Sequence, residues 1–307
     1  MNNFLALLCL SLALSSCASK KDVSSAKTEF LSCPKVDAAK APQLLWSTAG
    51  FSAPESVVFD DKSKSYYVSN VVGSPTEKDG QGWITKVSSA GKISKKKWAK
   101  NLNAPKGLKI RGPLLWATDI DQVRAFYLSS AKQSVLINVP EAKFLNDVAA
   151  TNEAIYVSDM MTGKVHAFRK SPSQSVVVDK GLESPNGLVV AGNTMLVANW
   201  GAPIEADFST KIPGRILEID LGTAAVSPWT KKPIGNLDGI EFDGPDAVIA
   251  SDWMAGKVLR ITKSGDCITL LEGFSGAADL TYIPATRTLV VPLMGEDKVN
   301  AYKIPQF

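Results

Sequence analysis

Histidine is nearly absent from this sequence of 307 residues, which contains only His166. A single imidazole cannot supply the histidine pair that some hydrolytic centres use, and zinc sites usually draw on imidazole and thiolate ligands. His166 lies in an apolar stretch that is expected to be a strand. Because a lone histidine in a strand rarely performs acid–base catalysis without a partner, we interpret His166 as a structural residue.

The sequence also lacks a strong charge of either sign. Its formal net charge is +4, and Lys95 to Lys97 form the only dense basic run. A nucleic-acid-binding protein is expected to carry a basic stripe rather than one isolated trio. We therefore interpret the trio as part of a solvated hairpin and predict no nucleic-acid partner.

The N-terminal apolar run is too short to cross a bilayer as a helix. It extends from Phe4 to Leu14, within residues 1–16 that carry no charged side chain, whereas a spanning helix needs roughly 20 apolar residues. This pattern predicts a secretion signal over residues 1–16.

The end of the signal, Leu14-Ser15-Ser16-Cys17, resembles the bacterial lipoprotein box, in which the cysteine is lipidated and becomes the first residue of the mature chain. The alternative is an ordinary signal peptide with an incidental cysteine. Ala18 stands where an aspartate, in enteric bacteria, resembles an inner-membrane retention signal. We therefore predict a lipid anchor at Cys17 in the bacterial cell envelope, in the outer membrane facing the periplasm, with no other membrane contact.

Only four cysteines are present, and their positions separate them. Cys9 leaves with the signal and Cys17 carries the lipid, so Cys33 and Cys267 remain. A cell-envelope compartment permits a disulfide between these two. Two free thiols are the alternative, because the sequence cannot show the Cα separation that a bridge requires.

The remainder of the chain divides into a tether and one repeating domain. Residues 17–42 are rich in Ser, Lys, Ala and Asp and predict a flexible tether. In residues 43–307 a turn with a polar residue repeatedly precedes two apolar strands, as in Gly181 to Trp200, GLESPNGLVVAGNTMLVANW. That polar residue recurs at intervals of 51, 40, 40, 52 and 41 residues, as Glu55, Lys106, Asn146, Asn186, Asp238 and Asp279. We call these six positions the first column.

Such periods, with several strands in each repeat, are typical of a β-propeller. A second column follows 13 to 15 residues later: Asn70, Asp119, Asp159, Asn199 and Asp252. Of these, Asp119, Asp159 and Asp252 are expected to cap turns within their blades. Five units end in a fourth strand, whereas the sixth stops at Phe307 after its third. The segment QLLWST, residues 43–48, supplies the missing strand. The sequence therefore predicts an all-β, six-bladed propeller, closed by an N-terminal strand that completes the last blade and leaves no large unpaired edge.

Both columns are expected at the same mouth of the ring, together with two long loops, residues 71–82 and 200–214. These loops belong to opposite blades and would wall a pocket over the axis. Four members of the first column would form its floor: Glu55, Asn146, Asn186 and Asp238. Two carboxylates and two amide oxygens suit a divalent cation such as Ca²⁺ better than zinc. The alternative is that these residues bond only their own turns.

The same residues carry a family resemblance. The segments PES (54–56), LND (145–147), SPNGL (184–188) and LDGIEFDGPDAVIASDWMAGKVLRITKSG (237–265) resemble the gluconolactonase, senescence marker protein and luciferin-regenerating enzyme family. The resemblance covers about residues 43–307, and the last segment is its most specific part.

This resemblance implies a six-bladed propeller with one axial divalent cation, usually Ca²⁺ and sometimes Zn²⁺ or Mn²⁺, that hydrolyses lactones or related esters. Glu55, Asn186 and Asp238 match the family's metal ligands, and Asn146 matches the Asn that touches metal or substrate. Asp238 would also activate the attacking water, because a carboxylate can take its proton.

Three further residues are candidates for substrate contact. Lys106 could bind an anionic group of the substrate, or only neutralise nearby carboxylates. Trp200 and Trp253 could form an apolar wall, or only pack the blades. Phe144 stands where sugar-lactone members commonly have an arginine, which favours a more apolar lactone.

Two functions stay open on the sequence alone. One is a metal-dependent hydrolase of a small lactone or ester, acting as a monomer. The other is a noncatalytic, envelope-tethered binding propeller that keeps the cation as a structural element of its axis.

Overall fold

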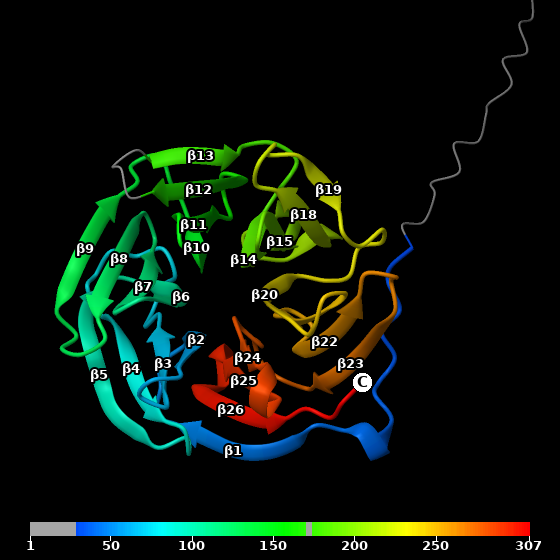
Figure 1. The fold of residues 1–307 in the computed structure, drawn as a ribbon, viewed down its shortest axis with the longest axis horizontal. Coiled ribbons are helices and arrows are strands. Elements are labelled where there is room, and N and C mark those ends of the chain that lie inside the picture. The colour runs from blue at the N-terminus through cyan, green and yellow to red at the C-terminus, as the bar shows by residue number, and fades with distance from the viewer. Residues whose placement is uncertain (1–28, 170–173) are drawn as a thin grey trace, which may run out of the picture.

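The computed structural model describes residues 29–169 and 174–307. The predicted signal and the lipidation site Cys17 lie outside this described part of the chain. Six four-stranded antiparallel sheets surround a central axis like the blades of a propeller (Figure 1). The predicted all-β six-bladed propeller is thereby confirmed. No helix in the described ranges is long and apolar enough to span a membrane.

The first three blades follow the chain without interruption, each from its innermost strand outwards. Blade one contains β2 (Pro54–Asp60), β3 (Ser65–Asn70), β4 (Gly82–Ser88) and β5 (Ile93–Leu102). Blade two contains β6 (Pro105–Arg111), β7 (Leu114–Asp119), β8 (Gln122–Tyr127) and β9 (Gln133–Asn138). Blade three contains β10 (Leu145–Ala150), β11 (Ala154–Asp159), β12 (Lys164–Arg169) and β13 (Gln174–Val178).

The last three blades include an insertion and the closing strand. Blade four contains β14 (Pro185–Ala191), β15 (Thr194–Asn199), β18 (Ile216–Asp220) and β19 (Val226–Pro228), with the hairpin β16 (Gly201–Ile204) and β17 (Thr210–Pro213) inserted. Blade five contains β20 (Leu237–Phe242), β21 (Ala247–Asp252), β22 (Lys257–Thr262) and β23 (Cys267–Glu272). Blade six contains β24 (Thr281–Ile283), β25 (Thr288–Leu293), β26 (Lys298–Lys303) and β1 (Gln43–Ala49). Three short 3₁₀ helices are Ala38–Lys40, Pro284–Thr286 and Met294–Glu296.

The closing strand β1 comes from the start of the described chain. It pairs antiparallel with β26, from Gln43 opposite Lys303 to Ala49 opposite Lys298 (Figure 1). Its Trp46 packs against Tyr66 of blade one, with ring centroids 5.7 Å apart. The strand thus covers the open edge of β26, which would otherwise be free to pair with another chain.

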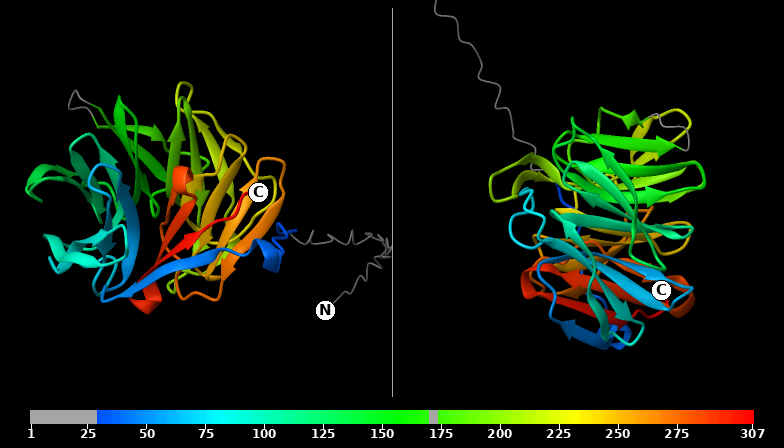
Figure 2. Two further views of the ribbon diagram at one scale, coloured as in Figure 1. Left: turned by 60° about the horizontal axis from the view of Figure 1, so that its bottom comes forward. Right: turned by 90° about the vertical axis from the view of Figure 1, so that its left-hand side faces the viewer.

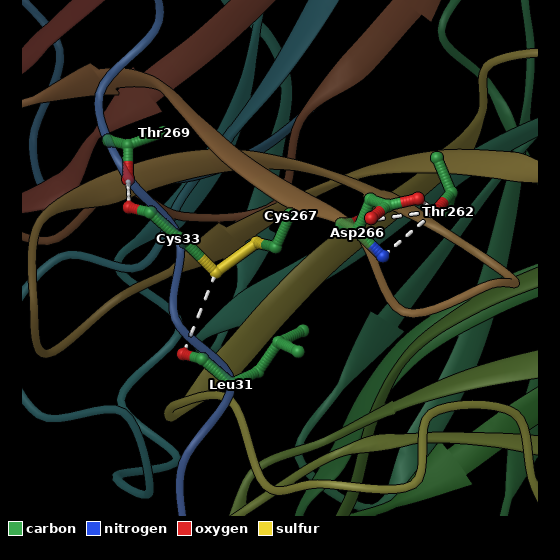
Figure 3. The surroundings of a disulfide bond; sticks show 6 residues. All are labelled: Leu31, Cys33, Thr262, Asp266, Cys267 and Thr269. Atoms are coloured by element: carbon green, nitrogen blue, oxygen red, sulfur yellow. Dashed lines mark hydrogen bonds between the residues drawn. A yellow bond between two sulfur atoms is a disulfide. The ribbon is translucent and has the colours of Figure 1, made fainter.

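The folded part begins earlier than Gln43, the start expected from the sequence. Lys35 forms a parallel bridge with Thr269 of β23, and Val36 N donates to Thr269 O at 2.9 Å. Cys33 and Cys267 form a disulfide with a Cα–Cα distance of 4.6 Å (Figure 3). Residues 31–36, expected to belong to the flexible tether, therefore lie along the rim of blade five. Backbone hydrogen bonds and a covalent bond hold them there, and neither depends on apolar periodicity.

The apolar core lies between neighbouring blades rather than in one central mass. Between blades three and four, for example, Tyr156 and Val165 pack with Leu188 and Met195. Every residue of β3 and of β11 is buried. A strand that is covered on both faces reads as a nearly continuous apolar run, which is why the repeat is visible in the sequence.

Candidate functional site

A pocket of about 250 Å³ opens over the axis of the ring. Its floor and lower wall contain all seven residues expected at the site: Glu55, Lys106, Asn146, Asn186, Trp200, Asp238 and Trp253. These residues come from five different blades, so no single blade contains the site. Their roles depend on the chemistry described below.

A break in strand pairing brings the first column to the axis. In β2 the ladder with β3 shifts between Pro54 and Val57, which leaves Glu55 outside regular pairing. The same shift flanks the first-column residue in four further innermost strands, β6, β10, β14 and β20. Bulges of this kind re-aim a side chain and are common beside active sites.

Close approach of neighbouring innermost strands fixes the floor. A Cβ atom at Gly187 would overlap the backbone carbonyl oxygen of Asp238, so only glycine fits there. Hydroxyl groups also link neighbouring blades: Ser158 Oγ accepts from Asp147 N at 2.9 Å and donates to Asn186 O at 2.7 Å. Thr118 Oγ1 donates to Asn146 O in the same way. The backbones that carry Asn146 and Asn186 are therefore held from the preceding blade.

The two floor carboxylates are buried and destabilised as anions. Burial, followed by the charges of Asp238 and Asp279, raises the pKa of Glu55 well above its ordinary value. Burial and the charge of Asp147 raise the pKa of Asp238 to about 8, while a hydrogen bond from the Asn186 side chain opposes this rise. Such carboxylates are stabilised in their ionised form by a nearby positive charge.

Two floor oxygens have no hydrogen-bond donor. Glu55 Oε2 and Asn186 Oδ1 are both buried and unpaired. They are among several buried side-chain atoms of the described residues without a partner, and on the pocket floor a bound cation would supply one. Within residues 29–169 and 174–307, no three His, Cys, Asp or Glu side chains are grouped to hold a metal ion. The candidate set differs from such groups because two of its four donors are amides, and its all-oxygen chemistry fits Ca²⁺.

Lys106 is the one positively charged residue of the floor, and it is 1% exposed. Its Nζ donates to Pro75 O at 2.9 Å and to Ala104 O at 3.1 Å, and lies 4.3 Å from the centroid of the Phe144 ring. Burial lowers its pKa to about 8, although the charge of Glu55 opposes this. Two of its three donors are therefore engaged by backbone carbonyls, and Phe144 covers it.

The pocket walls are mainly apolar. Trp200 and Trp253 lie with ring centroids 5.9 Å apart, and both line the pocket. Phe144 and Met160 join Trp200 in one buried cluster. Trp200 packs in this cluster and also lines the pocket, so the two roles expected for the tryptophans are compatible.

The two long loops both contribute to the lining of the pocket, as expected from their places in the ring. Pro75 of the β3–β4 loop and Phe208 of the β16–β17 hairpin both line it. Figure 2 shows the loop (cyan) and the hairpin (yellow-green) projecting from the same face of the disc. Trp200 Nε1 donates to Phe208 O at 2.8 Å, which ties the hairpin to the pocket wall.

The three aspartates of the second column cap turns. Asp119 accepts from Asn103 N and Ala104 N, and Asp159 accepts from Phe144 N at 2.9 Å. The same arrangement occurs in blade five, where Asp252 accepts from Asn236 N. These carboxylates lie behind the floor and fix the turns that lead into it.

A charged group that the sequence analysis missed lies beneath the floor. Lys109 Nζ and Glu241 Oε1 form an ion pair at 3.8 Å beside Asp147 and Asp279, around a cavity of about 10 Å³. Lys109 and Glu241 each follow a first-column residue by three positions. That spacing is the signal that could have found them. Burial raises the pKa of Asp147 to about 7, against hydrogen bonds from Leu188 N and Val148 N.

Asp279 and His166 do not reach the pocket. Asp279 lines the lower cavity and accepts a hydrogen bond from Ser56 Oγ. His166 is fully buried in β12, with its Nε2 4.0 Å from Asp159 Oδ2. Its position within blade three agrees with a structural role.

Comparison with known proteins shows the fold. No protein-family model and no curated protein matches the sequence. A gluconolactonase from Xanthomonas campestris, described as important in glucose secondary metabolic pathways, is similar in structure at 14% identity and a TM-score of 0.65, over 89% of this chain and 95% of that one.

Two other solved structures are similar over much of the ring. A catalytically inactive virginiamycin B lyase from Staphylococcus aureus with quinupristin has 11% identity and a TM-score of 0.56, over 85% of this chain and 99% of that one. A nidogen/laminin complex has 12% identity and a TM-score of 0.56, over 70% of this chain and 79% of that one. At these identities the similarity shows the propeller fold alone.

Proposed function

We propose that this protein hydrolyses a lactone or related ester in the axial pocket, with one divalent cation, Ca²⁺ before Zn²⁺ or Mn²⁺, as its cofactor. The observation that carries the proposal is the pair of unpaired buried oxygens on the floor, Glu55 Oε2 and Asn186 Oδ1. With Asn146 and Asp238 they form an oxygen set of charge −2, beside the single positive charge of Lys106. The structural similarity to a gluconolactonase supports a lactone as substrate.

Each residue of the site has its own proposed role in the reaction. When bound, a divalent cation would polarise the ester carbonyl and favour the ionised floor carboxylates. Asp238 is the proposed general base, because its carboxylate lines the pocket and, when ionised, can take the proton of an attacking water. Asn146 offers a side-chain amide to the substrate, while Trp200 and Trp253 hold its apolar part and exclude water.

Calcium titration and product analysis test the proposal. Protein stripped with a chelator should bind one Ca²⁺ by calorimetry. Once loaded with Ca²⁺, it should open members of a lactone and aryl-ester panel. Because one similar structure is a lyase, the products should be identified by mass. Hydrolysis adds one water to the lactone, whereas elimination yields an unsaturated acid of unchanged mass.

Matched variants separate the site from the fold. Asp238→Asn should abolish turnover and weaken Ca²⁺ binding. Asp60→Asn is the control, since Asp60 is also buried but accepts from Lys62 N at the other end of β2 and does not line the pocket. A Ca²⁺-loaded protein that is inert on the whole panel would refute hydrolysis and favour the noncatalytic binding propeller, in which Asp238→Ala lowers the melting temperature.

We also propose that the protein acts as a monomer, lipid-anchored at Cys17 in the outer membrane and facing the periplasm, with no nucleic-acid partner. The Cys33–Cys267 disulfide supports an envelope location, because structural disulfides persist in oxidising compartments. Cys17→Ser should move the protein from the membrane fraction to the soluble periplasmic fraction. Membrane retention of this variant, after a salt wash, would contradict the lipid anchor.

A further inference from the structure

A second cavity adjoins the pocket and shares part of its wall. This lateral groove has a volume of about 560 Å³ and lies between the turn after β11, the β3–β4 loop and the β16–β17 hairpin. Met160 and Phe208 line both the pocket and the groove. These two side chains therefore stand between the pocket and the groove.

The pocket alone is small for a ligand. Sites for drug-sized molecules occupy roughly 300–1,000 Å³, and the pocket of about 250 Å³ falls below this range. A compact ring would fill it. A larger substrate that extends past Met160 and Phe208 enters the groove, which is the adjoining space that shares those side chains.

The groove has a defined chemistry. Part of its wall is apolar, with Met160, Met161, Ile204 and Phe208 among the lining residues. Its acidic residues are Glu183 and Glu205, of which Glu205 is paired with Lys211 at 3.4 Å, and no lysine or arginine is among the described residues that line it. Such a surface favours a neutral alkyl chain and disfavours a chain that ends in a carboxylate.

We infer that the groove binds an uncharged alkyl or acyl substituent of the substrate, while the pocket holds the reacting ring. The inference rests on the proposed function and deepens it. The substrate class is a lactone with a medium-length apolar side chain, in contrast to a compact polyhydroxylated sugar lactone.

The test uses γ-lactones whose side chain at the ring carbon grows from methyl to octyl. For the wild-type protein, kcat/KM should rise roughly threefold per methylene over the first few carbons, as expected when each methylene leaves water. The analogue with a terminal carboxylate should be at least tenfold poorer than the alkyl lactone of equal length. A flat series, or equal rates for the carboxylate analogue, overturns the inference.

A variant that fills the groove supplies the structural control. Ala206 is exposed on the hairpin and lines the groove but not the pocket. Ala206→Trp should remove the chain-length dependence while leaving kcat/KM for the methyl lactone unchanged. Ala255→Trp is the matched control, because Ala255 is an exposed alanine in the β21–β22 turn that lines neither cavity. Equal loss of chain-length dependence in both variants would overturn the inference.

Binding of inert analogues separates this inference from hydrolysis. The γ-lactams with the same side chains resist hydrolysis, and their Kd can be measured by calorimetry. A Kd that falls with chain length in wild type but not in Ala206→Trp supports the groove even if every lactone is inert. A Kd independent of chain length overturns the groove even if lactones are hydrolysed.

Discussion

Replacing Asp238 by asparagine should stabilise the cation-free protein at neutral pH, although the residue is buried and lies on the pocket floor. In the folded protein the pKa of Asp238 is about 8, against an ordinary value of 3.8. Between these values the folded state binds more protons than the unfolded state. Stability therefore falls as the pH rises through this window, in contrast to a carboxylate held by a salt bridge.

The expected size of the effect follows from the pKa difference. Each pH unit inside the window costs about 1.4 kcal/mol for one group, so the wild-type protein should lose roughly 3 kcal/mol between pH 5 and pH 7 through Asp238. In the asparagine variant this loss is absent. The pKa of Glu55 also falls there, because the charge of Asp238 is one of the causes that raise it.

The assay is thermal or urea unfolding in chelator from pH 5 to pH 8. Between pH 5 and pH 7 the melting temperature of wild type should fall by roughly 6–12 °C relative to that of Asp238→Asn, at about 2–4 °C per kcal/mol. Asp246→Asn, at an exposed position, should follow the wild-type curve. Added Ca²⁺ at a hundredfold excess over its Kd should stabilise the wild type by about 2.7 kcal/mol and the variant far less.

Two results would refute this reasoning. Parallel pH curves for wild type and Asp238→Asn would mean that Asp238 carries no unusual proton affinity. A variant that is less stable than wild type in chelator at pH 7 would mean that the carboxylate is a structural hydrogen-bond acceptor, and not a charge that awaits a cation.

Three other predictions concern the supports of the site. The Cys33→Ser/Cys267→Ser variant should lose roughly 2–5 kcal/mol of unfolding free energy in urea, because the bridge closes a long loop; an unchanged midpoint would contradict this. Ser158→Ala removes a hydroxyl bonded at both ends, so it should cost about 1–3 kcal/mol and weaken Ca²⁺ binding in calorimetry; loss of stability with unchanged affinity would limit Ser158 to the fold. Lys106→Met frees the carbonyl of Pro75, so limited proteolysis should cut the β3–β4 loop faster than in wild type, and an unchanged rate would mean that other contacts hold the loop.

Repetition made most of the fold predictable. The six first-column residues mark six innermost strands, and the missing fourth strand at Phe307 located its replacement at Gln43. The start of the folded part was less predictable. Residues 31–36 attach to β23 through backbone atoms and one disulfide, and such contacts leave no apolar period in the sequence.

The floor of the pocket was predictable because its residues occupy one repeated position. The layer beneath the floor was not predicted, although Lys109 and Glu241 follow the first-column residues of their strands by three positions. The groove could not be derived from sequence. It depends on how the hairpin β16–β17 folds over the turn after β11. Within the described residues the other blades lack such an inserted hairpin, so the repeat in the sequence does not show where it lies.

The register shifts explain why one position can be both regular and variable. In five innermost strands the ladder breaks at the first-column residue, so this side chain is released from strand pairing and from the core between blades. The fold then places few demands on its identity, and Glu55, Lys106, Asn146, Asn186 and Asp238 can all stand there. Substitution at this position can change the charge of the pocket without dismantling a blade. The residues that decide the chemistry of the pocket therefore stand at the repeat position whose identity the fold constrains least.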